Sequence, residues 1–210
     1  MLTVSQTLSI PTKMMPLLGN QMLWRMKVEH YHKLIEEGAF LPHNDVELIH
    51  GVVIKKMSKN PPHSKANQRL LLLFIQLLSI RQGWFFMVQD PITLTDSEPE
   101  PDLAIARGTP DDYVGHPGPH DVGLVIEVAD SSLDYDKVVK HQLYAFAGIN
   151  EYWIVNLPDQ QLEVYTNPYR TPTGASYRQK TVYLAGDEVG VVLDGDEFGR
   201  IQVSDIFPPS

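Results

Sequence analysis

The sequence has 210 residues, of which 43% are hydrophobic and 20% charged, and it contains no cysteine. This length and apolar content suffice for one well-buried core, and the lack of cysteine excludes a disulfide framework and thiolate metal sites. The 17 Lys and Arg against 26 Asp and Glu leave a net charge of -9, so the whole molecule should repel nucleic acid at long range. Any polyanion binding therefore requires a local basic surface.

The beginning of the chain, MLTVSQTLSIPTKMMPLLGN, has no early positive region, and polar residues and Pro interrupt its apolar character, which argues against a signal peptide. No uncharged apolar run approaches the roughly 18 to 20 residues of a membrane span. We therefore expect a cytoplasmic protein without a membrane partner. Residues 1–25 are expected to form an N-terminal arm, and residues 26–210 a single domain.

Hydrophobic periodicity in the first half of the chain predicts two helices and two strands. Met26 to Glu37 has apolar residues at helical spacing. Val46 to Met57 is β-branched and predicts two short strands joined by a His50–Gly51 turn. Ser64 can cap a long helix that reaches about Arg81, and its LLLLFIQLL run is apolar on nearly every face, which predicts a central helix inside the core.

The second half is dominated by strands. They are expected at WFFMV, residues 91–95, DLAIA, GLVIEVA, EYWIVN, LEVY, residues 181–184 and residues 189–193. Between GLVIEVA and EYWIVN, Ser131 or Ser132 can cap a helix that ends at Ala147 before Gly148. The loop at residues 167–176 is the best candidate for a mobile connection. Together these elements predict a mixed sheet flanked by helices, of α+β or α/β class.

Two carboxylates stand at apolar strands. Asp102 begins DLAIA after a proline that cannot donate a ladder bond, and Glu127 lies inside GLVIEVA among apolar neighbours. A lone carboxylate in such a strand is costly to bury unless it is paired or binds a cation. Two oxygen ligands from adjacent strands, with a backbone carbonyl and waters, would suit octahedral Mg²⁺ or Mn²⁺. Such an ion could polarise a phosphate and lower the pKa of a bound water.

The helix after the second acid carries Asp136, Lys140 and Tyr144 at positions i, i+4 and i+8, with Lys137 close to Lys140. A positioned ammonium near the scissile phosphate could stabilise negative charge or orient the attacking water. This polar face would lie opposite a core face formed by Tyr135, Val139, Leu143 and Phe146. An ordinary surface helix with an Asp136–Lys140 pair is the alternative interpretation.

Several segments resemble the Uma-type family of putative restriction endonucleases: VELIHGVVIKKMS, PPHS, EPEPDLAIA, GLVIEVADSS, DYDKVVKHQLYAFAGINEYWIVN and LEVY. The resemblance extends from about Val28 to Phe207. It implies a restriction-endonuclease-like core with a variant of the PD-(D/E)xK nuclease motif. Asp102 and Glu127 would then be the metal-binding acids, and Val128 would contribute a carbonyl.

The chain departs from the standard motif at Ala129, where the pattern expects Lys two residues after the acid. In families of this kind the lysine function can move to the following helix, and the D-x-x-x-K spacing selects Lys140 ahead of Lys137. Glu47 lies on the strand that begins the core of the resembling family and could bind a second ion or hold a water. An edge-strand charge or a lysine pair accounts for Glu47 equally well.

Basic residues gather between Glu47 and Asp90, where no acidic residue occurs: Lys55, Lys56, Lys59, Lys65, Arg69 and Arg81. His63 beside the predicted helix N-terminus could also contact a phosphate. In a chain of net charge -9, this segment is a candidate phosphate-contacting surface. A solvated face and a structural histidine are the alternatives.

The leading hypothesis is a metal-dependent DNA endonuclease, with Asp102 and Glu127 binding Mg²⁺ or Mn²⁺ and Lys140 stabilising the phosphate or positioning water. The displaced lysine and the acidic net charge motivate an alternative, a nuclease fold kept as a binding or assembly module without turnover. A third possibility is a metal phosphoesterase that acts on small or RNA substrates. Double-strand cleavage by a single-site nuclease would favour a two-fold homodimer.

Overall fold

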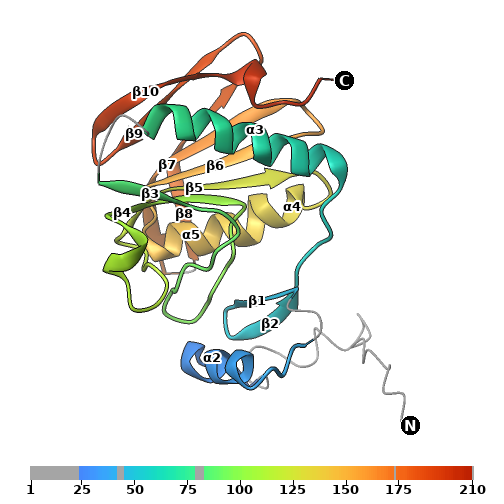
Figure 1. Cartoon of the computed structure of the whole chain (residues 1–210), viewed down its shortest axis with the longest axis vertical. Coiled ribbons are helices and arrows are strands. Elements are labelled where there is room, and N and C mark those ends of the chain that lie inside the picture. Colours follow the sequence, from blue (N-terminus) through green and yellow to red (C-terminus); the bar gives the residue numbers. More distant parts are fainter. Residues whose placement is uncertain (1–23, 42–44, 79–82, 173, 210) are drawn as a thin grey trace.

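The computed structural model of the protein describes residues 24–41, 45–78, 83–172 and 174–209. Its centre is a six-stranded sheet in the order β3-β4-β5-β6-β7-β8 (Figure 1). β5 and β6 run parallel, and the other neighbouring pairs run antiparallel. The strands are Trp84–Met87, Leu103–Arg107, Val122–Ala129, Glu151–Asn156, Gln161–Thr171 and Gly174–Tyr183. The predicted mixed sheet flanked by helices is therefore confirmed.

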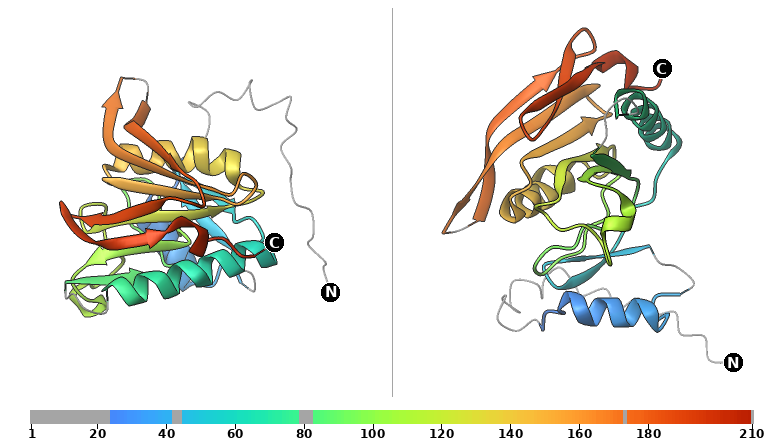
Figure 2. Two further views of the ribbon diagram at one scale, coloured as in Figure 1. Left: turned by 90° about the horizontal axis from the view of Figure 1, so that it is seen from above. Right: turned by 60° about the vertical axis from the view of Figure 1, so that its left-hand side comes forward.

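Alternating side chains give this sheet two apolar faces. On β5, Ile126 and Val128 face one core, while Val125 and Ala129 face the other. The first core is covered by the long helix α3 and a two-stranded sheet, and the second by a helix, so the layers lie on opposite faces (Figure 2). These covering elements are α3 (Pro61–Leu78), β9 (Glu188–Leu193), β10 (Asp196–Gln202) and α5 (His141–Ala147).

A helical crossover joins the parallel strands β5 and β6, as parallel pairing requires. It begins with α4 (Leu133–Tyr135), widens into a π-helical turn over Asp136–Lys140 and continues as α5. Gly148 ends it in the left-handed region, with a φ of 87°. The predicted helix between these strands is confirmed. Ser132, one of the two expected caps, occupies the N-cap position, but its side chain makes no capping hydrogen bond.

The helix α2 (Val28–Glu36) and the hairpin of β1 (Val46–Ile49) and β2 (Val52–Lys55) lie together at the lower end of the molecule in Figure 1. His50 and Gly51, which connect the strands, both have positive φ, as a two-residue hairpin turn with the twist of its strands requires. The predicted turn is confirmed. Leu48 packs on α2, whereas Ile49 joins the core beneath the crossover. Because side chains alternate, Glu47 faces the main sheet.

The start of α3 differs from the prediction. The helix begins at Pro61, three residues before Ser64. The Asn60 side chain accepts a hydrogen bond from the backbone N–H of His63 at 3.1 Å, so Asn60 caps the helix and Pro61 takes the first helical position. The predicted end near Arg81 lies outside the described residues.

The expectation that LLLLFIQLL is buried on every face is wrong. Leu70 and Phe74 have no exposed surface, but Leu72 is 61% exposed and Ile75 is 43% exposed. The reason is that α3 covers one face of the sheet and leaves its outer side uncovered by described residues. Helical periodicity, rather than apolar content, decides which leucines enter the core.

Two further predictions fail in the loops. Residues 91–95 form no strand, because the backbone N–H groups of Ile92, Thr93 and Leu94 donate to loop carbonyls instead of a ladder. The segment 167–176 is mostly strand, since β7 continues to Thr171 and β8 starts at Gly174. β10 was not predicted.

Among the described residues, no helix is both long and apolar enough to cross a membrane. Most of the predicted N-terminal arm, residues 1–23, lies outside the described residues. The single domain over residues 26–210 stays a prediction.

Candidate active site

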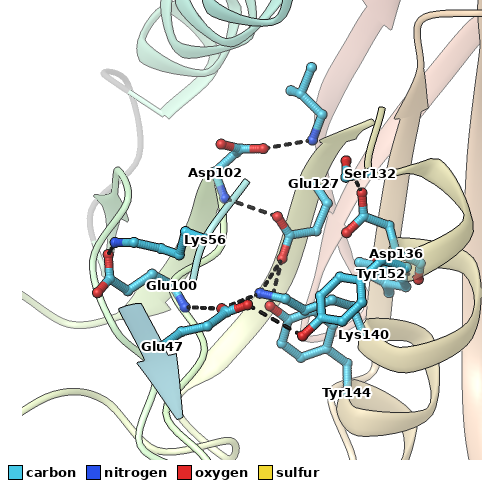
Figure 3. A network of polar contacts seen from close by, with 12 residues as sticks. Glu47, Lys56, Glu100, Asp102, Glu127, Ser132, Asp136, Lys140, Tyr144 and Tyr152 are labelled. Atoms are coloured by element: carbon cyan, nitrogen blue, oxygen red, sulfur yellow. Dashed lines mark hydrogen bonds and ion pairs between the residues drawn. The ribbon is translucent and has the colours of Figure 1, made fainter. Parts of the chain in front are cut away.

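The two acids singled out in the sequence lie side by side. Asp102 immediately precedes β4, and Glu127 lies on the neighbouring strand β5. The backbone N–H of Asp102 donates to Glu127 Oε2 at 3.3 Å, and each residue is 6% exposed (Figure 3). The sheet register therefore brings both carboxylates to one buried position.

Asp102 is held as an anion by three groups. The backbone N–H of Val128 donates to its Oδ2 at 2.9 Å, and His63 Nε2 lies 3.0 Å from the same oxygen. Lys59 Nζ is 3.5 Å from the other oxygen, Oδ1. Burial alone would raise the pKa of Asp102, but His63, the Val128 N–H and Lys59 lower it below its ordinary value. Asp102 is thus a fixed negative charge.

Glu127 is a carboxylate in a less polar setting. Tyr144 donates to its Oε1 at 2.8 Å, and Lys140 Nζ lies 3.4 Å from the same oxygen. Burial raises the pKa of Glu127 to about 7, although Lys140 opposes this effect. Glu127 therefore has a pKa close to neutral pH, unlike Asp102.

Lys140 joins Glu127 to a third acid. Its Nζ donates to Glu47 Oε2 at 2.6 Å, and both residues are 4% exposed. Burial would lower the pKa of Lys140, but Glu127 and Glu47 raise it above its ordinary value, so the side chain is an ammonium ion. The hairpin β1–β2 and the crossover helix thus meet at this ion pair (Figure 3).

Glu47 also accepts from the backbone N–H of Glu100 at 3.4 Å, and Tyr135 Oη lies 3.5 Å from its Oε1. Glu100 in turn binds Lys56 Nζ at 2.5 Å. Glu47 thus forms an ion pair with a lysine, which is one of the interpretations that the sequence allowed. Through Lys140 it also belongs to the same polar network as Asp102 and Glu127.

The crossover helix buries its polar side as well as part of the predicted core face, of which Leu143 is buried and Val139 packs on the core. Asp136, Lys140 and Tyr144 are buried, and Phe146 is 49% exposed. Ser132 donates to Asp136 at 2.6 Å, while burial and the neighbouring Glu127 raise the pKa of Asp136 to about 8. The polar side faces inward because the buried carboxylates of the sheet lie beneath it (Figure 3).

These groups surround a cleft of about 80 Å³. Of the basic segment predicted to contact phosphate, Lys56, Lys59 and His63 line this cleft. The remaining described members of the segment do not: Lys55, Lys65 and Arg69. Arg69 instead donates to the backbone carbonyl of Asp205 at 2.6 Å, and Arg81 lies outside the described residues. Besides Lys140, the cleft therefore receives positive charge from Lys56 and Lys59, which precede α3 in the chain.

The two lysines that compete for the displaced motif position separate in space. Lys140 enters the cleft, whereas Lys137 Nζ lies 2.8 Å from Glu163 Oε1 and does not line the cleft. The D-x-x-x-K spacing favours Lys140, and this lysine lies beside the acids in the structure.

The donor set of the site suits a hard cation. Among the described residues, no group of three or more His, Asp and Glu side chains is arranged to hold a metal ion. The Lys140 ammonium lies between two of the three acids. Mg²⁺, however, keeps several waters and is usually bound by one or two carboxylates together with substrate phosphates. Asp102 and Glu127 provide that number of carboxylates.

Two residues complete the site in ways that the sequence did not predict. Tyr144 was placed on the helix face of Lys140, but its hydrogen bond to Glu127 was not predicted. The backbone N–H of Glu100 supports Glu47. Glu100 lies two residues before Asp102, but nothing in the sequence distinguishes it from a surface charge.

The chain is similar to known proteins both in sequence and in fold. Residues 28–195 match the model of the Uma2 family, described as “putative restriction endonuclease”. The crystal structure of a putative nuclease belonging to DUF820 from Anabaena variabilis is similar, with a TM-score of 0.61 and 18% sequence identity. The similarity covers 82% of this chain and 96% of that one. None of the curated proteins matches the chain.

Proposed function

The chain belongs to the Uma2 family of putative restriction endonucleases, and on this premise we propose that it is a metal-dependent DNA endonuclease. The observation that carries the proposal is the convergence of Asp102, Glu127 and Lys140 in one cleft. The family supports a nuclease acting on nucleic acid, and the fold is that of a structure described as a putative nuclease. The ion, the DNA substrate and the role of each residue are part of the proposal.

In this proposal Asp102 and Glu127 hold Mg²⁺ or Mn²⁺, with the backbone carbonyl of Val128 as a further oxygen ligand. The bound ion supplies Lewis-acid polarisation of the phosphate and lowers the pKa of a coordinated water. Asp102 supports this role because His63 and the Val128 N–H both bind Oδ2, which leaves Oδ1 toward Lys59. An anionic carboxylate with one oxygen fixed is suited to present the other.

Lys140 has the position and charge for electrostatic catalysis. Its buried ammonium can stabilise negative charge that develops on the phosphate or orient the attacking water, because such interactions are strong where water is excluded. Glu47 binds this ammonium at 2.6 Å and thereby orients it toward the cleft. Glu47 thus serves in the proposal as the partner that holds the lysine, while Lys56, Lys59 and His63 contact the DNA backbone from the rim of the cleft.

The test is plasmid cleavage by purified protein in Mg²⁺ or Mn²⁺. We expect nicking that disappears in chelator and in the Asp102→Ala variant, with a loss of about 100-fold or more because the cation loses a ligand. Asp134→Ala is the matched control, since this exposed carboxylate on α4 does not line the cleft. Cleavage that survives Asp102→Ala would overturn the assignment, and DNA, RNA and a nucleotide offered together would reveal the preferred substrate.

A second candidate function is a nuclease fold that binds DNA or a protein partner without turnover. It is favoured by the Lys140 ammonium, which already pairs with both Glu47 and Glu127 in the described structure. This function requires no divalent ion. Calorimetric titration with Mg²⁺ and Mn²⁺ separates the two functions, because heat of metal binding that vanishes in Asp102→Ala supports the endonuclease alone.

Two expectations remain predictions at this point. A cytoplasmic location is expected because the sequence shows neither a signal-peptide pattern nor a long apolar run. A homodimer would allow both strands of a duplex to be cut, and sedimentation of the purified protein would determine its oligomeric state.

A further inference from the structure

Glu163 is a further buried carboxylate, and it lies on the same face of the main sheet as Glu127. In the strand register Glu127 pairs with Ile154 of β6, and Ile154 pairs with Glu163 of β7. The three residues therefore form one row across neighbouring strands. At a strand spacing of about 4.8 Å, the backbones of the two acids are about 10 Å apart. The crossover helix packs on this face.

Glu163 is fully buried and heavily bonded. Its side chain has no exposed surface, and it binds Lys137 Nζ at 2.8 Å and Lys180 Nζ at 2.7 Å. The Tyr165 hydroxyl donates to it at 2.6 Å, and the amides of Asn156 and Gln161 donate at 3.1 and 3.0 Å. Burial would raise the pKa of Glu163, but these donors, led by Lys137, hold it at about 2. Glu163 is a permanent anion.

The two lysines that bind this row come from one helical turn. Lys140 reaches Glu127 and Glu47, whereas Lys137 reaches Glu163. In an α-helix, residues three apart lie on the same side. The turn from Asp136 to Lys140 is π-helical, and such turns are frequent at functional sites. The wider turn lets the two ammonium groups diverge toward acids two strands apart.

We propose that Glu163 is a positioning residue, which holds Lys137 and thereby fixes the π-helical turn that presents Lys140 to the active-site acids. This inference rests on the proposed function for its catalytic consequence. Without the Lys137 bond, one end of the turn loses its anchor on β7, and the Lys140 amine can shift relative to the cleft. A displacement of about 1 Å at a catalytic group can reduce a rate by roughly 100-fold.

The chain offers a matched pair of variants. Lys137→Met and Lys180→Met each remove one ammonium from the same carboxylate, at similar distances of 2.8 and 2.7 Å. Lys137 belongs to the helical turn, but Lys180 belongs to β8 on the far side of Glu163. A purely structural role of the ion pairs predicts similar effects of both substitutions. Positioning predicts an effect of Lys137→Met alone on turnover.

We expect Lys137→Met to lower kcat by about 10-fold to 100-fold with little change in KM, while Lys180→Met retains kcat. Lys137→Arg, which keeps the charge, should recover much of the activity. Equal losses of kcat in both variants, or no loss in Lys137→Met, would overturn the inference. If Lys137→Met does not fold, as judged by circular dichroism, Lys137→Gln takes its place.

An activity-independent measurement separates this inference from the proposed function. The buried Lys140 ammonium should give a slowly exchanging signal in ¹H–¹⁵N spectra of the lysine side chains. We expect Lys137→Met to shift or broaden that signal and Lys180→Met to leave it in place. An unchanged Lys140 signal in both variants contradicts positioning even if the protein cuts DNA. A change specific to Lys137→Met supports positioning even if no cleavage is found.

Discussion

Substitution of Lys140 by Met should strongly destabilise the folded protein. The substitution removes the ammonium that lies 2.6 Å from Glu47 and 3.4 Å from Glu127, and these acids are only 4% and 6% exposed. Loss of one partner from a buried ion pair costs about 3–5 kcal/mol, because the other charge stays buried without compensation. Since domains are stable by about 5–15 kcal/mol, the variant should remain folded but with a large part of its stability lost.

The loss of folding stability in Lys140→Met should also depend on pH. Burial already raises the pKa of Glu127 to about 7 with Lys140 present, and without the ammonium this pKa must rise further. When folding raises the pKa of a carboxyl, the folded protein binds more protons than the unfolded protein. The folded protein therefore loses stability as the pH increases above about 4.5, the ordinary pKa of a Glu side chain. The difference between wild type and Lys140→Met should therefore grow only above about pH 7, where Glu127 ionises in the wild type but not in the variant, and should be larger at pH 8 than at pH 5 by up to about 1.4 kcal/mol.

The measurement is urea denaturation in metal-free buffer at both pH values, followed by the fluorescence of the buried Trp153. Lys55→Met serves as the control, because Lys55 is exposed and does not line the cleft, and its loss should change stability by less than about 0.5 kcal/mol. The reasoning is refuted if Lys140→Met costs less than about 1 kcal/mol at pH 8, or if its cost is the same at pH 5. Either result would mean that the two acids are already protonated or solvated.

Two further predictions concern the hairpin and the first residue of β6. Gly51→Ala should cost about 1–3 kcal/mol in thermal unfolding, because Gly51 has a φ of +72° and an added Cβ would lie 2.7 Å from Arg25 Cβ and 2.9 Å from the Met26 carbonyl oxygen. An unchanged Tm would contradict the close approach. Burial raises the pKa of Glu151 to about 7 even though the Trp153 indole N–H donates to it, so wild-type stability should fall between about pH 4.5 and 7. Glu151→Gln should flatten this part of the pH profile of urea midpoints, and parallel profiles would count against the assignment.

Local sequence patterns predicted most of the sheet and the two acids. Alternation and β-branched content located β4, β5 and β6, and the positive φ values at His50 and Gly51 match the turn expected there. The argument for Asp102 and Glu127 required no tertiary information, because burying a carboxylate in an apolar strand is costly wherever the strand lies. Both acids are in fact buried and paired.

The failures share a physical cause. The sequence could not show that one side of LLLLFIQLL stays exposed, because apolar content does not reveal how many layers cover a helix. For the same reason the sequence could not show that the polar side of the crossover helix is buried together with Leu143. It faces inward because the sheet places buried acids beneath it, and that depends on the register of three strands.

The sequence by itself determined which acids carry a burial cost, which residues are basic and which lysines stand on the crossover helix. The tertiary structure alone decided that Lys140 joins Glu47 across 93 positions of sequence while Lys137 binds Glu163. Helical spacing treats these lysines almost alike. In the structure the two lysines differ, because the π-helical turn directs them to acids that lie on different elements. An ion pair forms only where packing brings opposite charges together, and the sequence alone does not show where that happens.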